Sequence, residues 1–122
     1  MSEAEIEYRR HEVFVHDLAG WRRERVPTRP KGKPMRTTPD WVCEILSPSN
    51  AKNDQVHKFR VLKEMRVPHY WLVDPDRGLL TVYRFHDGNY VVAQVAPRDE
   101  GVRAEPFDAV ELSVAKLLGE ED

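Results

Sequence analysis

The sequence has few of the features that would tie a protein to a membrane or to an oxidising compartment. Cys43 is the only cysteine among 122 residues, which excludes an intrachain disulfide and a cysteine-rich metal site. No apolar run approaches the roughly 20 residues that a transmembrane helix requires. The N-terminus, MSEAEIEYRRHEVF, has acids and arginines where a signal peptide would need a continuous apolar stretch. We therefore expect a cytoplasmic protein with no membrane partner.

The net charge is small as well, at −2, which argues against a general affinity for nucleic acid. The charge is unevenly distributed, however, because residues 9–36 contain nine Lys and Arg against three acids, whereas residues 37–122 contain ten against fifteen. Such a basic stretch could bind a polyanion such as DNA locally, or it could be a solvated loop. The candidate residues for nucleic-acid contact are Arg22, Arg23, Arg25, Lys31 and Lys33.

The apolar pattern predicts one domain, residues 1–122, with a mixed α/β fold. An apolar residue recurs every three positions from Val56 to Met65, which predicts a helix that begins near Asn53 or Asp54. This helix lies between two buried strands and favours a right-handed crossover that makes them parallel. The predicted strands are residues 11–18, 40–46, 69–74, 79–85, 89–95 and 102–107, with a turn at 47–50, a tight hairpin turn at 86–89 and a last short helix at 114–118.

Two segments fall outside these predicted elements. Residues 20–38 form a basic stretch rich in proline and glycine, which predicts a long irregular loop. Loops of this length are usually either functional or disordered. Residues 1–10 precede the first predicted strand, and we expect them to be flexible or to pair with a partner.

One carboxylate, Glu44, lies inside the apolar strand of PDWVCEILSPSN. Burying an ionised carboxylate without a partner costs several kcal/mol, so Glu44 must be reached by solvent, ion-paired or bound to a metal. Asp17 ends the preceding strand, and Lys58 lies on the helix that follows. Two carboxylates and a lysine suit a hard cation such as Mg²⁺ acting on a phosphodiester. The alternative is a buried ion pair of Glu44 and Lys58, with Asp17 capping a loop.

Three segments of the chain together resemble a known family. PDWVCEILSPSN, DQVHKF and VPHYWLVDPDRGLLTVYRF are similar to the Uma2 family of restriction endonucleases, once catalogued as a domain of unknown function, and the similarity covers roughly residues 13–118. The family has the PD-(D/E)XK nuclease-like fold, a mixed β-sheet with flanking helices. The resemblance implies a metal-dependent endonuclease that hydrolyses DNA, with Mg²⁺ or Mn²⁺ and no organic cofactor.

The resemblance also implies a role for three residues. Asp17 and Glu44 correspond to the two acids of the family, which would bind the metal, and Lys58 corresponds to the lysine that stabilises the transition state. Two positions depart from the pattern: His16 precedes the first acid where the family usually has proline, and Leu46 stands where the general nuclease pattern has its lysine.

The segment before Asp17 is shorter than is usual in the family, so we expect the N-terminal part of the fold to be missing. This leaves open a catalytically incomplete remnant that acts as a structural, interaction or nucleic-acid-binding domain. An exposed sheet edge invites pairing with another subunit, so we also expect a homodimer.

Overall fold

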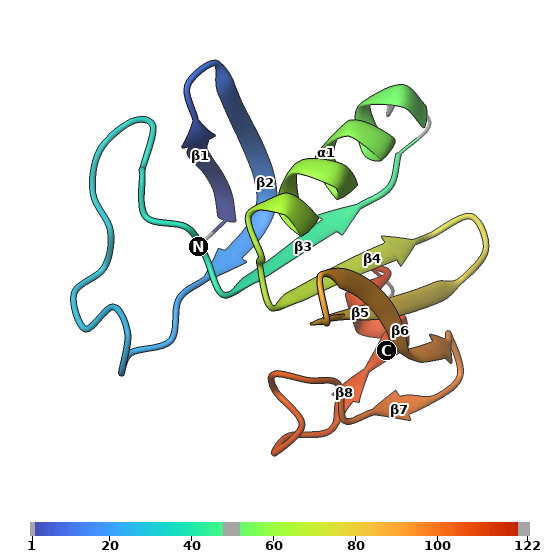
Figure 1. Cartoon of the computed structure of the whole chain (residues 1–122). Coiled ribbons are helices and arrows are strands. Elements are labelled where there is room, and N and C mark those ends of the chain that lie inside the picture. Colours follow the sequence, from blue (N-terminus) through green and yellow to red (C-terminus); the bar gives the residue numbers. More distant parts are fainter. Residues whose placement is uncertain (1, 48–51, 120–122) are drawn as a thin grey trace.

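The computed structural model describes residues 2–47 and 52–119, so most of the predicted turn at 47–50 lies outside the described residues. Six strands form one mixed sheet in the order in which they occur along the chain (Figure 1). Five of them lie within a residue or two of the predicted strands. The strands are β1 (Ser2–Arg9), β2 (Glu12–Gly20), β3 (Trp41–Ile45), β4 (His69–Asp74), β5 (Leu79–His86) and β6 (Asn89–Pro97).

A single long helix, α1 (Lys52–Glu64), connects β3 to β4 and packs on one face of the sheet (Figure 1). The strands β3 and β4 are parallel, while every other neighbouring pair in the sheet is antiparallel. The predicted crossover and the predicted α/β class with a mixed sheet are therefore confirmed. Val61 and Leu62 are the buried side chains of α1, whereas Val56 is half exposed.

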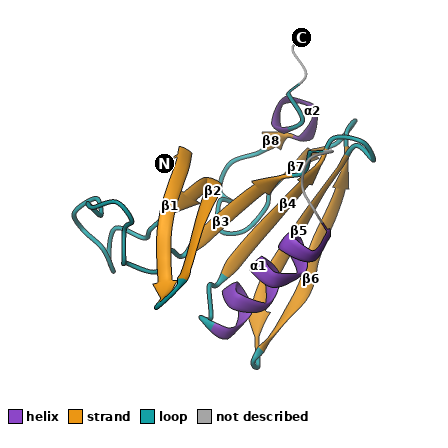
Figure 2. Ribbon diagram, turned by 90° about the horizontal axis from the view of Figure 1, so that it is seen from above, coloured by secondary structure: helices purple, strands orange, loops and turns teal. Residues whose placement is uncertain are grey.

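The C-terminal segment packs on the opposite face of the sheet. It contains β7 (Gly101–Val102), β8 (Leu112–Ser113) and the short helix α2 (Val114–Leu117), which begins after the predicted cap, Ser113 (Figure 2). The strand predicted at 102–107 is wrong beyond Val102, because a turn follows in which the Phe107 N–H donates to the Ala104 carbonyl at 2.8 Å. Val102 and Ala104 are apolar because both are buried, although the chain beyond Val102 is not paired with another strand.

Each face of the sheet therefore has its own apolar core. Val42 and Tyr70 belong to the core under α1, while Cys43 and Trp71 belong to the core under the C-terminal segment. Neighbouring residues of β3 and β4 thus point to opposite faces, as strand geometry requires. This explains why residues 70–73 are apolar without interruption.

The strand β1 was not among the predicted elements. Instead of a flexible segment, residues 2–9 form an antiparallel pair with β2, and Ile6 and Tyr8 are buried in the core under α1. The loop at 20–38 is irregular, as predicted, but it is tied to this strand. The Met35 N–H donates to the Glu5 carbonyl at 2.9 Å, and the Glu7 N–H donates to the Met35 carbonyl at 2.8 Å.

The hairpin between β5 and β6 turns at Asp87 and Gly88, with φ values of 50° and 77°. Positive φ at both central residues defines the tight turn that matches the twist of the two strands, and Asp-Gly is a favoured pair for it. The predicted hairpin is confirmed. Among the residues that the structure describes, none of the helices has the length and apolar character needed to cross a membrane.

Candidate active site

Glu44 lies on β3 and faces α1, on the same side as Val42. Its side chain is almost fully enclosed, with 6% of the residue exposed. The carboxylate therefore cannot be hydrated in the ordinary way and must be compensated by neighbouring groups.

Two basic side chains provide this compensation. Nδ1 of His16 lies 2.5 Å from Oε1 of Glu44, and Nζ of Lys58 lies 3.5 Å from Oε2. The Lys58 side chain is mostly buried and its ammonium lies 5.9 Å from the centre of the Phe14 ring. The structure thus brings Glu44 and Lys58 together, as both the catalytic interpretation and the ion-pair interpretation predict.

His16 is a member of the site that the sequence analysis missed. It is fully buried, and its second nitrogen, Nε2, lies 2.6 Å from the Tyr8 hydroxyl. Burial, with smaller effects from the charges of Tyr90 and Glu44, raises the pKa of Tyr8 and keeps its hydroxyl protonated. The two ring nitrogens of His16 thus contact two different buried groups, the Tyr8 hydroxyl at Nε2 and the Glu44 carboxylate at Nδ1.

A sequence signal for His16 existed, but it was incomplete. Alternation along β2 places His16 on the same face as Phe14, opposite the exposed Val13 and Val15. What the sequence could not supply was the position of β2 beside β3, which brings this face to Glu44. Tyr8 could not be found because its strand was not predicted.

Asp17 lies beside β3 but in a different setting. Its Oδ2 accepts a hydrogen bond of 2.7 Å from the Ile45 N–H. The ladder between β2 and β3 pairs Leu18 with Cys43, and one further step along this register would place Asp17 opposite Glu44. The alternation of buried residues in β2 breaks here, since His16 and Ala19 are buried and the two residues between them are not.

The pKa of the neighbouring Cys43 thiol reflects its burial and the negative charge of this region. Burial raises the pKa of Cys43 to about 12, and the negative charges of Glu44 and then Asp17 add to the effect. Both carboxylates therefore act on the same point of β3. The Cys43 thiol is therefore protonated at neutral pH and is not a nucleophile of this site.

Carboxylate oxygens such as those of Asp17 and Glu44 are ligands for a hard cation that takes only a few of its ligands from the protein. Among the described residues, no three His, Cys, Asp or Glu side chains converge to form a metal site. Mg²⁺, however, is commonly held by one or two carboxylates, with waters and substrate phosphates as its other ligands. Asp17 and Glu44 are ligands of this chemical type; Oε2 of Glu44 is contacted by Lys58 and not by His16, and Oδ2 of Asp17 accepts from the Ile45 N–H.

The basic residues of the 20–38 loop divide into two kinds. Arg25 is used within the protein, because its Nε lies 3.0 Å from Oδ1 of Asp40 and fixes the start of β3. The other four predicted nucleic-acid contacts are exposed side chains of the loop. They are Arg22, Arg23, Lys31 and Lys33.

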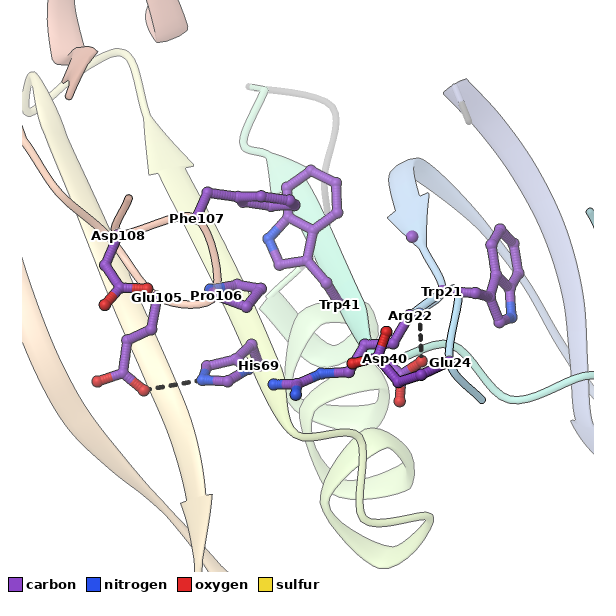
Figure 3. Close-up of a pocket in the computed structure, with 11 residues that line it drawn as sticks. Trp21, Arg22, Glu24, Asp40, Trp41, His69, Glu105, Pro106, Phe107 and Asp108 are labelled. Atoms are coloured by element: carbon purple, nitrogen blue, oxygen red, sulfur yellow. Dashed lines mark hydrogen bonds and ion pairs between the residues drawn. The ribbon is translucent and has the colours of Figure 1, made fainter. Parts of the chain in front are cut away.

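A separate cavity of about 670 Å³ opens at the other end of β3 and β4 (Figure 3). Trp41, His69 and Phe107 line it, and Nε2 of His69 donates to Glu105 at 2.8 Å. Asp17, Glu44 and Lys58 do not line this cavity. It is therefore distinct from the cluster around Glu44.

Comparison with solved structures gives the class of the protein. The chain is similar to the crystal structure of "a putative nuclease belonging to DUF820" from Anabaena variabilis, with a TM-score of 0.71 and 23% sequence identity. The match covers 98% of this chain and 66% of the solved chain, so this chain spans slightly less than two thirds of that protein. The fold is thus that of a nuclease-like α/β protein.

The sequence profile of Uma2, described as "Putative restriction endonuclease", matches residues 2–115. The chain belongs to the Uma2 family, which confirms the resemblance found in the sequence. No curated protein matches the chain.

Proposed function

We propose that this protein is a metal-dependent endonuclease that hydrolyses DNA phosphodiester bonds at the Glu44 cluster. The observation that carries the proposal is a carboxylate buried next to a lysine, on a strand whose neighbour brings a second carboxylate. Membership of the Uma2 family and the nuclease-like fold support the same chemistry.

Each residue of the cluster would have a separate task. Asp17 and Glu44 would hold Mg²⁺ or Mn²⁺, which when bound supplies an activated water and positive charge at the phosphate. Lys58 would offset the negative charge that develops on the phosphate in the transition state. His16 would hold Oε1 of Glu44 in place and so leave Oε2 for the metal.

The basic loop would supply affinity for the DNA backbone. Arg23, Lys31 and Lys33 are exposed, and phosphate contacts made by such residues are weakened by salt. We also propose that the active form is a homodimer.

The second candidate function is a catalytically incomplete nuclease-fold domain. Both oxygens of Glu44 are already contacted by protein groups, and a buried ion pair needs no metal. In that case the cluster would only stabilise the fold. DNA binding through the loop would then persist without cleavage.

Plasmid nicking in the presence of Mg²⁺ or Mn²⁺ tests the proposal. Glu44→Gln keeps the shape of the side chain and should abolish nicking, while thermal unfolding shows that the variant is folded. Glu64→Gln, on the exposed ion pair of α1 with Arg9, is the matched control and should nick like the wild type. Absence of nicking by the wild type with either metal, or equal nicking by Glu44→Gln, would refute the enzyme.

Calorimetric titration with Mg²⁺ or Mn²⁺ separates the two candidates without relying on activity. Binding that is lost in Asp17→Asn supports the metal site. No binding up to millimolar metal supports the incomplete domain.

A further inference from the structure

The sheet has two outer strands, β1 and β6, which lie at its opposite ends (Figures 1 and 2). An outer strand presents unpaired N–H and C=O groups that readily pair with another strand. Proteins usually cover such an edge or place charges on it. The two edges of this sheet differ in both respects.

The β1 edge is protected twice. Met35 of the long loop occupies it with two backbone hydrogen bonds, to Glu5 and Glu7. The strand SEAEIEYR also carries three glutamates, so a second copy placed against it would meet like charges. Self-pairing through β1 is therefore disfavoured.

The β6 edge has neither protection. Its nine residues, NYVVAQVAP, contain no charged side chain, and proline occurs only at the last position. Within the described part of the chain, no loop forms backbone hydrogen bonds with the outer side of residues 89–96. Val92 and Val95 on this strand are 57% and 51% exposed.

These valines continue an apolar surface beside α1. Val92 pairs with Tyr83 and Val95 with Thr81, and these rows lie on the face that α1 covers further along the sheet. Val56 of α1, the helix that packs on this face, is also 50% exposed. The uncovered edge is thus joined to uncovered apolar side chains.

We propose that two copies of this chain pair through β6, antiparallel and related by a two-fold axis perpendicular to the sheet. The occupant is a second copy because the strand is compatible with itself, having no charge to repel its equivalent, and because two-fold pairing is closed. The two sheets become one continuous sheet, and the valines of both copies lie on the same face as cross-strand neighbours. The inference specifies the surface of the proposed homodimer and does not depend on nuclease activity.

The axis also has a consequence for the candidate active site. A two-fold axis perpendicular to the sheet leaves both α1 helices on one face. Because Glu44 faces α1 in each copy, the two Glu44 clusters lie on the same side of the extended sheet. One nucleic-acid duplex could then be approached by both.

Light scattering coupled to size exclusion at micromolar concentration tests the surface. The wild type should have twice the 14.3 kDa mass of one chain, and Val92→Lys or Val95→Lys should reduce it to one chain. Val15→Lys is the matched control, because Val15 is 53% exposed on the inner strand β2, and this variant should remain dimeric. A monomeric wild type, or equal dissociation by the Val15 and Val92 variants, would overturn the proposal.

Disulfide trapping tests the geometry directly, since the native Cys43 is buried. Under mild oxidation the double variant Val92→Cys/Val95→Cys should form covalent dimers, whereas Val15→Cys should remain monomeric on non-reducing gels. Trapping by Val15→Cys alone would overturn the proposal. A dimer that forms through β6 but does not nick DNA would contradict the proposed nuclease and leave this surface intact.

Discussion

Replacing His16 by leucine is the most informative perturbation of the Glu44 cluster. His16 has no exposed surface and bridges two buried polar groups, the carboxylate of Glu44 and the hydroxyl of Tyr8. Leucine fills a similar space but can neither donate nor accept. Both neighbours then lose a partner without gaining access to water.

The expected cost follows from these two losses. A hydrogen bond to a charged group contributes about 1.5–3 kcal/mol, and a stranded buried hydroxyl costs about 1–3 kcal/mol. His16→Leu should therefore lower the free energy of unfolding by about 2.5–6 kcal/mol. A domain of this length has a total stability of roughly 6–18 kcal/mol, so the loss is large.

The assay is equilibrium unfolding in urea, compared with two further variants. Tyr8→Phe removes the hydroxyl and leaves the buried Nε2 of His16 without a partner, so it should cost about 1–3 kcal/mol. The double variant Tyr8→Phe/His16→Leu no longer contains a stranded hydroxyl, so it should cost at least about 1 kcal/mol less than the sum of the single variants. His16→Asn keeps an N–H near the position of Nδ1 and should recover part of the stability.

The reasoning would be refuted by a loss below about 1 kcal/mol in His16→Leu, or by additive single variants. Either result would mean that Glu44 and Tyr8 are satisfied without His16. The test concerns stability only, so it is valid whether or not the protein cleaves DNA.

Three further predictions follow from the buried groups. With its pKa raised to about 12 by burial, Cys43 is almost wholly protonated at pH 8, so iodoacetamide should label it only after denaturation, as mass spectrometry would show. Burial also raises the pKa of Tyr8, Tyr70 and Tyr90, so stability should be unaffected at neutral pH and fall above about pH 9–10, where the unfolded chain ionises first. Each group contributes about 1.4 kcal/mol per pH unit, and a constant melting temperature from pH 8 to 11 would contradict this. Lys58→Met should remove nicking and also lower the melting temperature, because it takes a charged partner from the buried Glu44 carboxylate; nicking at the wild-type rate would contradict the role of Lys58.

Most of the fold could be predicted from sequence because its elements carry local signals. The strand at 69–74 has an apolar run of the right length, and Asp87-Gly88 directly marks the turn of the hairpin between β5 and β6. The N-terminal strand could not be predicted in the same way. The alternation of Ala4, Ile6 and Tyr8 with glutamates is present in this strand. However, the strand is held in place by β2 and by the loop at Met35, which lie elsewhere in the sequence.

The candidate site shows the same division between local and non-local information. Glu44 was identifiable because a carboxylate in an apolar strand is costly wherever the strand lies. Lys58 followed from its place on the next helix. His16, in contrast, is an ordinary residue of its own strand, and only the register of β2 against β3 gives it a role.

The departure at His16 bears directly on how the site can work. A proline at this position has no side-chain donor, so it could not hold Oε1 of Glu44 as His16 does. With His16 present, one oxygen of Glu44 is fixed from inside the protein and the other is held by Lys58, whose flexible stem can move away. A metal that binds Glu44 therefore competes with the lysine and not with the histidine. His16→Leu should consequently weaken metal binding, because the Glu44 carboxylate is then free to turn. Lys58→Met should strengthen metal binding or leave it unchanged. Calorimetric titration of the two variants would distinguish this arrangement from one in which Lys58 alone positions Glu44.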